Sequence, residues 1–249
     1  MNVPRPLAVA DDGNLEPVAR LAALDAESLE TALNRDGCAL VPSLLDSAEC
    51  ARIAALYDDE QRFRSRVIMS RHGYGRGEYR YFSYPLPPLV QALRAALYAL
   101  LVPIANQWHE RMRIAVRFPP THAEFLARCH AAGQLQPTCL LLSYGTGDYN
   151  CLHQDVYGEH VFPLQAAVLL ARPQTDFDGG EFVLTEQQPR MQSRPFVVPL
   201  AQGAAVIFAV RHRPVQGTRG SYRVNLRHGV SRITCGSRRT LGVILHDAR

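Results

Sequence analysis

From Gln136 to the C-terminus the sequence is a series of short apolar or alternating runs, each bounded by residues that favour turns. Seven runs have this character: "TCLLLSY", "LQAAVLLA", "GEFVLTE", "PFVVPL", "AAVIFAV", "YRVNLRHGVSRI" and "RTLGVILHD". Stretches such as "GTGD", "DFDGG" and "VQGTRG" separate them, and their glycines and aspartates allow the backbone conformations that tight turns require. Seven or eight short strands within residues 136–249 predict a β-sandwich or jelly roll.

The residues before this β-rich part favour helices. Apolar residues recur at helical spacing in four segments: "LDAESLETALNRDG", "DSAECARIAALYDD", "PLVQALRAALYALLVPIANQWHERM" and "THAEFLARCHAAG". We expect the third helix to bend or break at Pro103, because proline lacks the amide hydrogen that a helix interior needs. Residues 62–84 combine alternation with arginines, aromatic residues and glycines, and they predict a β-hairpin.

Together these patterns predict one compact α+β unit. It has a loose lead over residues 1–22, an α-rich region with a hairpin over residues 23–135, and a jelly-roll core over residues 136–249. With 249 residues and 47% hydrophobic content, the chain is long enough to bury such a core. The most apolar stretch, "ALRAALYALLVPIANQW", contains Arg94 and Pro103, so it predicts a core helix and not a membrane span.

The charge of the chain is mild. All 27 basic residues are arginine, and the formal net charge at pH 7 is +4. The arginines do not form the concentrated basic stripe of a dedicated nucleic-acid binder, so we do not expect nucleic acid as a partner. The six cysteines are scattered without a Cys-x-x-Cys pair, and the N-terminus has no basic region leading into an apolar one. These features predict reduced thiols and a cytoplasmic protein without a membrane anchor.

The stretch "NCLHQDVYGEH" places His153 and Asp155 two residues apart. On a strand, residues i and i+2 lie on one face, so this imidazole and this carboxylate can point into the same cavity. The pattern is weak alone, because His-x-Asp is common in solvated loops. Two histidines in the late β region can supply a third ligand: His212 opens the turn-rich "HRPVQGTRG", and His228 closes the alternating "YRVNLRH".

Two histidines and one carboxylate on one side of a metal form the facial triad of non-haem Fe(II) oxygenases. Three protein ligands hold Fe(II) in such a site, and the three remaining positions accept a bidentate co-substrate and O₂. The single carboxylate offsets part of the 2+ charge of the metal without locking it in the ferric form. The ligand types in this sequence therefore favour oxygenase chemistry.

Four motifs, in this order, resemble those of the Fe(II)/2-oxoglutarate-dependent oxygenases on the prolyl-hydroxylase-like branch: "YGTGDYNCLHQD", "DFDGGEF", "GAAVIF" and "HGVSRITCGSRRTL". A wider match, spanning most of the chain, resembles bacterial proteins described as proline-hydroxylase-like oxygenases. The resemblance implies a double-stranded β-helix, the jelly roll of this superfamily, with an α-rich N-terminal part packed against it. It also implies that His153, Asp155 and His228 bind Fe(II).

The same resemblance points to residues that bind the co-substrate. In this branch a basic residue about ten positions after the distal histidine binds the far carboxylate of 2-oxoglutarate, and that position is Arg238. The tenth position after His212 is Tyr222, so the resemblance selects the later histidine. A tyrosine nine positions before the first histidine contacts the co-substrate in this branch, and that residue is Tyr144. Arg239 is the alternative to Arg238, because a slip of one residue reverses the faces of a strand.

The resemblance further implies a hydroxylase that uses Fe(II), 2-oxoglutarate and O₂, releases succinate and CO₂, and needs ascorbate as a reductant in vitro. We expect a peptidyl, prolyl-like substrate or a small molecule. Residues 62–84 are either the lining of the substrate entrance or a structural hairpin with solvated arginines. For Asn150 and Gln165, packing or turn roles are favoured over contacts near the metal.

Several related proteins are excluded by particular residues. A cupin would show His-x-His followed by Glu, and a 2-oxoglutarate-dependent halogenase would lack Asp155. The nucleic-acid demethylase branch carries Arg-x-Asn-x-Thr-x-Arg after the distal histidine, and "SRITCGSRRTL" does not supply it. Two alternatives stay open. One is a nucleic-acid or nucleotide oxidising member of the superfamily, which the arginine content favours; the other is a non-catalytic jelly-roll binding module, which the intact ligand set opposes.

Overall fold

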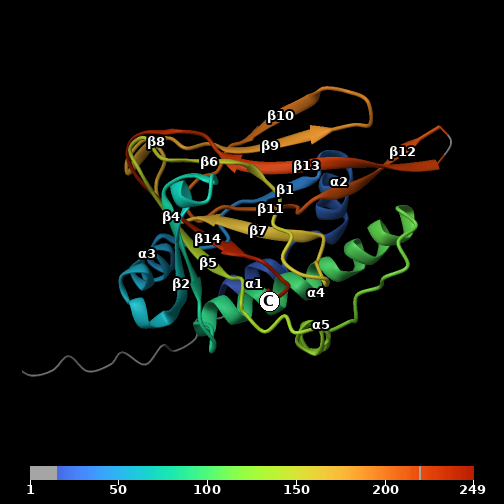
Figure 1. Cartoon of the computed structure of the whole chain (residues 1–249), viewed down its shortest axis with the longest axis horizontal. Helices are drawn as coiled ribbons and strands as arrows, with labels where there is room; N and C mark the ends of the chain where they lie inside the picture. The colour runs from blue at the N-terminus through green and yellow to red at the C-terminus, as the bar shows by residue number, and fades with distance from the viewer. Residues whose placement is uncertain (1–15, 219) are drawn as a thin grey trace, which may run out of the picture.

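The computed structural model describes residues 16–218 and 220–249 of the chain. Two antiparallel sheets lie one above the other, and helices run along the outer side of the larger sheet (Figure 1). All five α-helices of the described residues precede Gln136, and ten of the fourteen strands follow it. The prediction of an α+β fold with a jelly-roll core is confirmed.

The larger sheet has eight strands. In spatial order they are β1 (Cys38–Val41), β11 (Ala205–Ala209), β7 (Leu164–Leu169), β14 (Ile233–Val243), β5 (Leu140–Gly145), β4 (Glu78–Phe82) and β2 (Phe63–Ile68), with β8 (Phe177–Gly179) paired to β14. Strand β14 pairs with β5 along one edge and with β7 and β8 along the other. Because side chains alternate along a strand, Arg238, Thr240 and Gly242 of β14 share one face.

The smaller sheet has six strands. They are β10 (Ser193–Val198), β9 (Phe182–Gln187), β13 (Gly220–Val230), β6 (Tyr149–His153) and β3 (Gly75–Arg76), with β12 (His212–Gly217) paired to β13. Strands β6 and β13 are neighbours, so the segment that ends at His153 lies beside the segment that carries His228. All seven runs that were predicted as strands lie on strands. Strands β8 and β12 were not predicted, and β6 was implied only by the strand assumed around His153.

Strands from the N-terminal region complete both sheets. Strand β1 pairs with β11 at one edge of the larger sheet, and the predicted hairpin forms β2 and β4, which extend the other edge beyond β5. Strand β3 pairs with β6 in the smaller sheet. The segment 62–84 therefore contacts both layers of the jelly roll at the end where β6 lies.

The helices are α1 (Glu16–Ala22), α2 (Ala26–Asp36), α3 (Ser47–Ala55), α4 (Pro88–Arg111) and α5 (His122–Ala131), with 3₁₀ turns η1 (Leu56–Asp58), η2 (Glu60–Arg62) and η3 (Met69–Arg71). The side chain of Asp25 caps α2, which ends at the left-handed Gly37. The loose lead predicted for residues 1–22 needs correction: residues 1–15 lie outside the described residues, but α1 follows. Helix α1 forms because Leu21 is buried in the core, against which α4 also packs.

Helix α4 runs through Pro103 without a break, so the break allowed by the sequence analysis is wrong. Its neighbours Val102 and Ile104 are buried, and this packing offsets the hydrogen bond that proline cannot donate. By length and composition α4 could cross a membrane, but half of its most apolar stretch is buried inside the protein. It lies under the larger sheet as a core helix (Figure 1). All six cysteines are free thiols, as predicted.

Candidate active site

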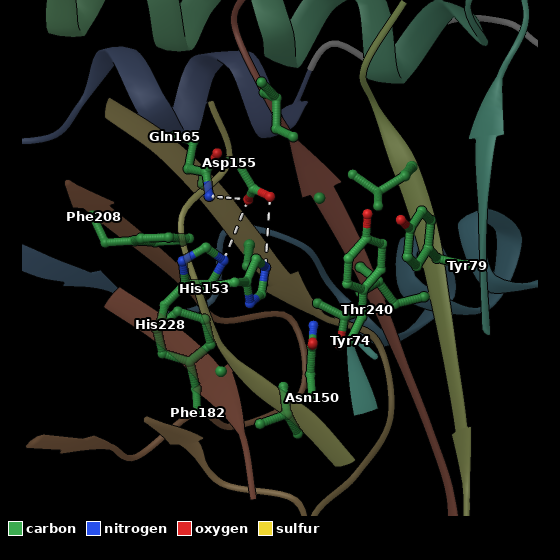
Figure 2. A pocket seen from close by; sticks show the side chains of 18 of the residues that line it. Tyr74, Tyr79, Asn150, His153, Asp155, Gln165, Phe182, Phe208, His228 and Thr240 are labelled. Carbon is green, nitrogen blue, oxygen red and sulfur yellow. Dashed lines mark hydrogen bonds and ion pairs between the residues drawn. The ribbon is translucent and has the colours of Figure 1, made fainter. Parts of the chain in front are cut away.

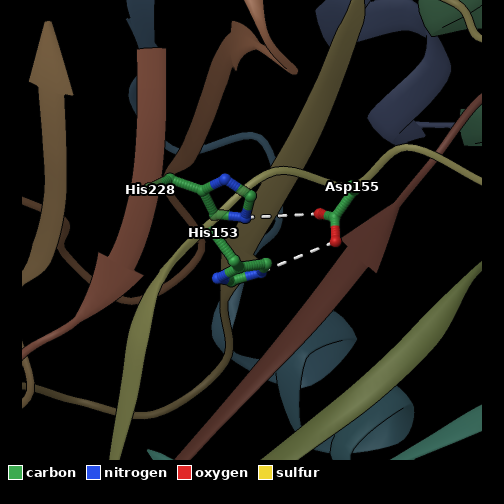
Figure 3. A group of neighbouring side chains, drawn as sticks. All are labelled: His153, Asp155 and His228. Atoms are coloured by element: carbon green, nitrogen blue, oxygen red, sulfur yellow. Dashed lines mark ion pairs between the residues drawn. The ribbon is translucent and has the colours of Figure 1, made fainter. Parts of the chain in front are cut away.

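His153 and His228 come from neighbouring strands of the smaller sheet. Strand β6 ends at His153, whose Cα partner on β13 is His228, and the two ring centroids are 4.2 Å apart. The rings of Phe208 and Phe182 pack against His228 at centroid distances of 4.7 and 5.9 Å. Figure 3 shows both imidazoles turned toward Asp155. The backbone register of two strands thus sets the spacing of the imidazoles.

Asp155 follows the end of β6 in an irregular segment, so the strand alternation assumed from the sequence does not extend to it. Its Oδ1 lies 3.5 Å from Nε2 of His153, and its Oδ2 lies 3.3 Å from Nε2 of His228. One ligand atom from each residue lies within 4.8 Å of the others. In the part of the chain that the structure describes, this is the one cluster of His, Cys, Asp or Glu side chains spaced for a metal ion.

Two neutral side chains hold the Asp155 carboxylate. The Tyr157 hydroxyl donates to Oδ1 at 2.7 Å, and the Gln165 amide donates to Oδ2 at 2.7 Å. The Cys151 carbonyl lies 2.8 Å from Nδ1 of His153, which leaves Nε2 directed at the carboxylate. A packing or turn role was expected for Gln165, and no role was expected for Tyr157. A signal for Gln165 was present, because it is the polar residue within the apolar run "LQAAVL".

The protonation states of Asp155 and His228 suit a cation. Burial opposes the charge of Asp155, but hydrogen bonds from both imidazoles outweigh it and hold the pKa of this carboxyl well below its usual value. Burial lowers the pKa of His228, and the neighbouring His153 lowers it further. Burial also acts to lower the pKa of His153, yet the hydrogen bond with Asp155 outweighs it and raises that pKa. The cluster therefore offers an anionic carboxylate and a neutral imidazole, the forms that bind metals.

Arg238 lies on β14, lines the same cavity and is 1% exposed. Its Nη1 donates to Oγ1 of Thr240 at 2.6 Å, while its Nε has no hydrogen-bond partner among the described residues. No acidic side chain of residues 16–218 or 220–249 forms a salt bridge with it, and burial lowers its pKa to about 10. A buried cation is costly unless an anion accompanies it, so this guanidinium is suited to bind a carboxylate.

Tyr144 lies beside this guanidinium. It pairs with Arg238 across β5 and β14, is 1% exposed, and its ring centroid is 5.8 Å from Cζ of Arg238. Its hydroxyl accepts a 3.4 Å hydrogen bond from Asn150. The structure therefore places the two residues expected to contact the co-substrate side by side. Asn150 contacts Tyr144 and not the His and Asp cluster.

Arg239 points to the opposite side of the sheet. Its Nη1 donates to the carbonyl of Ala54 at 2.8 Å, and its guanidinium lies 4.7 Å above the ring of Tyr57, next to α3 and η1. His212 is likewise remote from the cluster, because it lies on β12 opposite Asn225 and does not line the cavity. The structure brings together the residues that were preferred from the sequence and separates the alternatives.

The cavity between the sheets has a volume of about 210 Å³. Figure 2 shows His153, Asp155 and His228 on one side of it and Tyr79 on the opposite side. From the segment 62–84 the cavity receives Tyr74, Tyr79 and Tyr81, and none of its arginines. The segment is therefore both a structural hairpin and part of the cavity wall.

Comparison with known proteins identifies the family. A family described as "Oxygenase, catalysing oxidative methylation of damaged DNA" matches residues 77–248. The chain belongs to this oxygenase family. Two Mycobacterium tuberculosis proteins, "Uncharacterized protein MT2286" and "Uncharacterized protein Rv2227", are each 47% identical to the oxygenase over 167 residues, which cover 67% of its chain and 72% of the relative.

Solved structures share the fold of the oxygenase. A prolyl-4-hydroxylase from Pseudomonas putida matches with a TM-score of 0.53 and 16% identity, over 90% of this chain and all of that chain. An oxidoreductase of the 2OG-Fe(II) oxygenase family from Burkholderia pseudomallei matches with a TM-score of 0.52 and 17% identity, over 91% and 93%. With the family match and the His and Asp cluster, they identify an enzyme of the Fe(II)/2-oxoglutarate-dependent superfamily, as predicted.

Proposed function

We propose that this oxygenase binds Fe(II) through His153, Asp155 and His228, and 2-oxoglutarate through Arg238 with Tyr144 beside it. The observation that carries the proposal is the buried guanidinium, which forms no salt bridge among the described residues and lines the same cavity as the three metal-capable side chains. A 2-oxo dicarboxylate suits both ends of this cavity. Its 2-oxo acid end can chelate a metal, and its far carboxylate can pair with the planar guanidinium.

The residues fit Fe(II). Two imidazole nitrogens and one carboxylate oxygen are the ligand set of non-haem Fe(II) oxygenases, and the cavity leaves room on the remaining side. Besides its contacts with the two imidazoles, Asp155 accepts one hydrogen bond at each oxygen from a neutral side chain, at Oδ1 from Tyr157 and at Oδ2 from Gln165. Contacts of this kind orient a ligand and tune its affinity for the metal.

The chain's own residues bind and orient the co-substrate, and they exclude water. Fe(II), when bound, supplies the activation of O₂ that couples decarboxylation of 2-oxoglutarate to oxidation of a substrate. Arg238 holds the co-substrate at its far carboxylate, and the apolar rings of Phe182 and Phe208 close one side of the metal position. A dry cavity strengthens these polar contacts and protects reactive species from water.

For the substrate, we propose a base within a nucleic acid. The family description names damaged DNA, and it opposes our expectation from the sequence that nucleic acid is not a partner. The competing proposal is the peptidyl, prolyl-like or small-molecule substrate expected from the sequence. The absence of the Arg-x-Asn-x-Thr-x-Arg signature favours that competitor, so the two substrate classes need a direct test.

Succinate release from 2-oxoglutarate tests both parts of the proposal. The purified oxygenase is assayed with Fe(II) and ascorbate, and in parallel with single-stranded oligonucleotides, prolyl peptides and free amino acids. We expect oligonucleotides to stimulate succinate release. We also expect them to gain oxygen, which mass spectrometry detects. We expect His153→Ala and Asp155→Ala to abolish release; release at the wild-type rate would show that the site assignment is wrong. Stimulation by peptides alone would assign the substrate to the competing class.

A further inference from the structure

Three tyrosines wall the side of the cavity that faces the metal cluster, and we call this space the tyrosine chamber: Tyr79, Tyr81 and Tyr157. Tyr79 and Tyr81 are two residues apart on β4, so they share a face. Their rings meet at 82° with centroids 5.3 Å apart, and Tyr81 and Tyr157 meet at 88° with centroids 6.4 Å apart. The three rings that line this part of the cavity therefore pack edge to face against one another.

The walls of the tyrosine chamber are neutral and held in place. Burial raises the pKa of Tyr79 and of Tyr81, so both phenols keep their protons. Arg64 does not line the cavity, but its guanidinium lies 4.5 Å above the ring of Tyr81 and donates to the Pro137 carbonyl at 3.0 Å. This contact fixes the orientation of the ring. The side chains that complete this part of the lining are apolar: Leu140, Leu142 and Ile244.

The tyrosine chamber is joined directly to the metal cluster. The Tyr157 hydroxyl, which belongs to the third wall, donates to Oδ1 of Asp155 at 2.7 Å. A group that enters the chamber therefore lies next to the carboxylate proposed to bind Fe(II). On the solvent side, Tyr74 also lines the cavity and is 49% exposed, so another aromatic face marks the entrance.

We infer that the tyrosine chamber is the specificity pocket of the oxygenase and receives one planar, uncharged heteroaromatic ring, the base of a single-stranded nucleic acid. This inference rests on the proposed function and names the part of the substrate that is recognised. Fixed aromatic faces stack on any base, because every base has a π face, and phenol hydroxyls can hydrogen-bond to its edge. The pyrrolidine ring of proline is puckered and has no π face, so it can pack on these walls but cannot stack on them as a base does.

Binding of short, fluorescently labelled single strands tests the inference without turnover. The strands are oligothymidylate, oligocytidylate, oligoadenylate and an abasic strand of the same length and charge, each measured with Mn(II) and 2-oxoglutarate present. We expect at least one base-bearing strand to bind about 10- to 100-fold more tightly than the abasic strand. Tyr81→Leu should remove this preference. Tyr81→Phe should keep it, because the ring remains.

Two controls make the result specific. Tyr79→Leu tests a second wall in case Tyr81→Leu does not fold, and Tyr222→Leu removes a tyrosine of β13 that does not line the cavity. We expect the first to lose the preference and the second to retain it. Equal binding of base-bearing and abasic strands by the wild type would overturn the inference, as would a Tyr81→Leu variant that keeps the preference.

The proposed metal centre is tested separately, by Mn(II) binding and by succinate release in the absence of an oligonucleotide. If both are present and the base preference is absent, the chamber inference fails while the proposed metal chemistry stands. If the base preference depends on Tyr81 but Mn(II) does not bind, the metal assignment fails and the chamber inference stands. The two proposals can therefore fail independently.

Discussion

His153 and His228 are register partners across β6 and β13, and their ring centroids lie 4.2 Å apart. The hydrogen-bonded backbone of the smaller sheet therefore sets the separation of the two imidazoles. The third member of the cluster, Asp155, lies beyond the end of its strand, and Tyr157 and Gln165 hold it by hydrogen bonds. The site is thus fixed partly by the sheet and partly by side chains, and the two contributions can be tested separately.

Removing a proposed ligand should remove metal binding. Asp155→Asn keeps the shape of the side chain but loses its charge, and His228→Ala loses one imidazole. We expect each change to weaken Mn(II) or Co(II) binding by more than about 100-fold, beyond the 10- to 100-fold effect of altering a residue that only supports a ligand. Isothermal titration calorimetry measures the affinity. His160→Ala, in the same stretch but outside the cluster, is the matched control and should bind like the wild type.

Substitutions of the neighbouring Arg238 and Arg239 of β14 should have very different effects on the KM for 2-oxoglutarate. Arg238→Gln removes the buried guanidinium, so we expect the KM for 2-oxoglutarate to rise about 10- to 100-fold, the size of a lost hydrogen bond to a charged group. Arg239→Gln removes a contact with α3 and η1 and should leave that KM within about twofold. The reverse order in a succinate assay would contradict the placement of Arg238 in the site.

The β-rich part of the fold was predictable because its signal is local. Each strand there has its own apolar or alternating pattern and its own flanking turn residues, so seven of them were predicted without knowledge of their partner strands. Arg238 was selected only through the family resemblance, by its distance from His228, and the sequence left Arg239 open as the alternative. Gln165 was also visible as a polar residue on an apolar strand, although its hydrogen bond to Asp155 was not predicted.

The features of the fold and site that were not predicted depend on contacts between distant parts of the chain. Strand β4 pairs with β5 about 60 residues later, and this pairing, which carries Tyr79 and Tyr81 into the cavity, has no local signature. The continuation of α4 through Pro103 depends on burial in the core, which a propensity argument does not include. Asp155 lies beyond the end of its strand, so it joins the cluster with the two histidines without the strand alternation assumed from the sequence.

The hydrogen bonds to Asp155 should matter for metal affinity even though neither donor is a proposed ligand. Gln165→Leu and Tyr157→Phe each remove one donor, at Oδ2 and Oδ1 respectively. We expect Mn(II) affinity to fall about 10- to 100-fold in each variant, because the carboxylate is then less well oriented. Calorimetry gives the affinity, and a melting curve shows whether the variant is folded. Tyr84→Phe, which loses a hydroxyl contact with Asp247 instead, should bind Mn(II) normally.

His122 should make the oxygenase less stable in acid. It is buried at the start of α5, where its Nε2 donates to the Leu245 carbonyl at 2.8 Å, and burial, assisted by the charge of Arg94, lowers its pKa to about 4. In the unfolded chain its pKa is about 6.5. Above pH 6.5 both states are neutral and the full stability is present. As the pH falls toward 4, only the unfolded state gains the proton, so stability decreases by up to about 3 kcal/mol.

The variant His122→Gln tests this pH dependence, because glutamine can still donate to the Leu245 carbonyl but does not titrate. We expect the free energy of unfolding of the wild type to fall more steeply between pH 6.5 and 4 than that of the variant, measured by denaturant titration at each pH. Exposed His72→Gln is the control and should follow the wild-type curve. Parallel curves for the wild type and His122→Gln would show that the buried imidazole is not a source of the acid sensitivity.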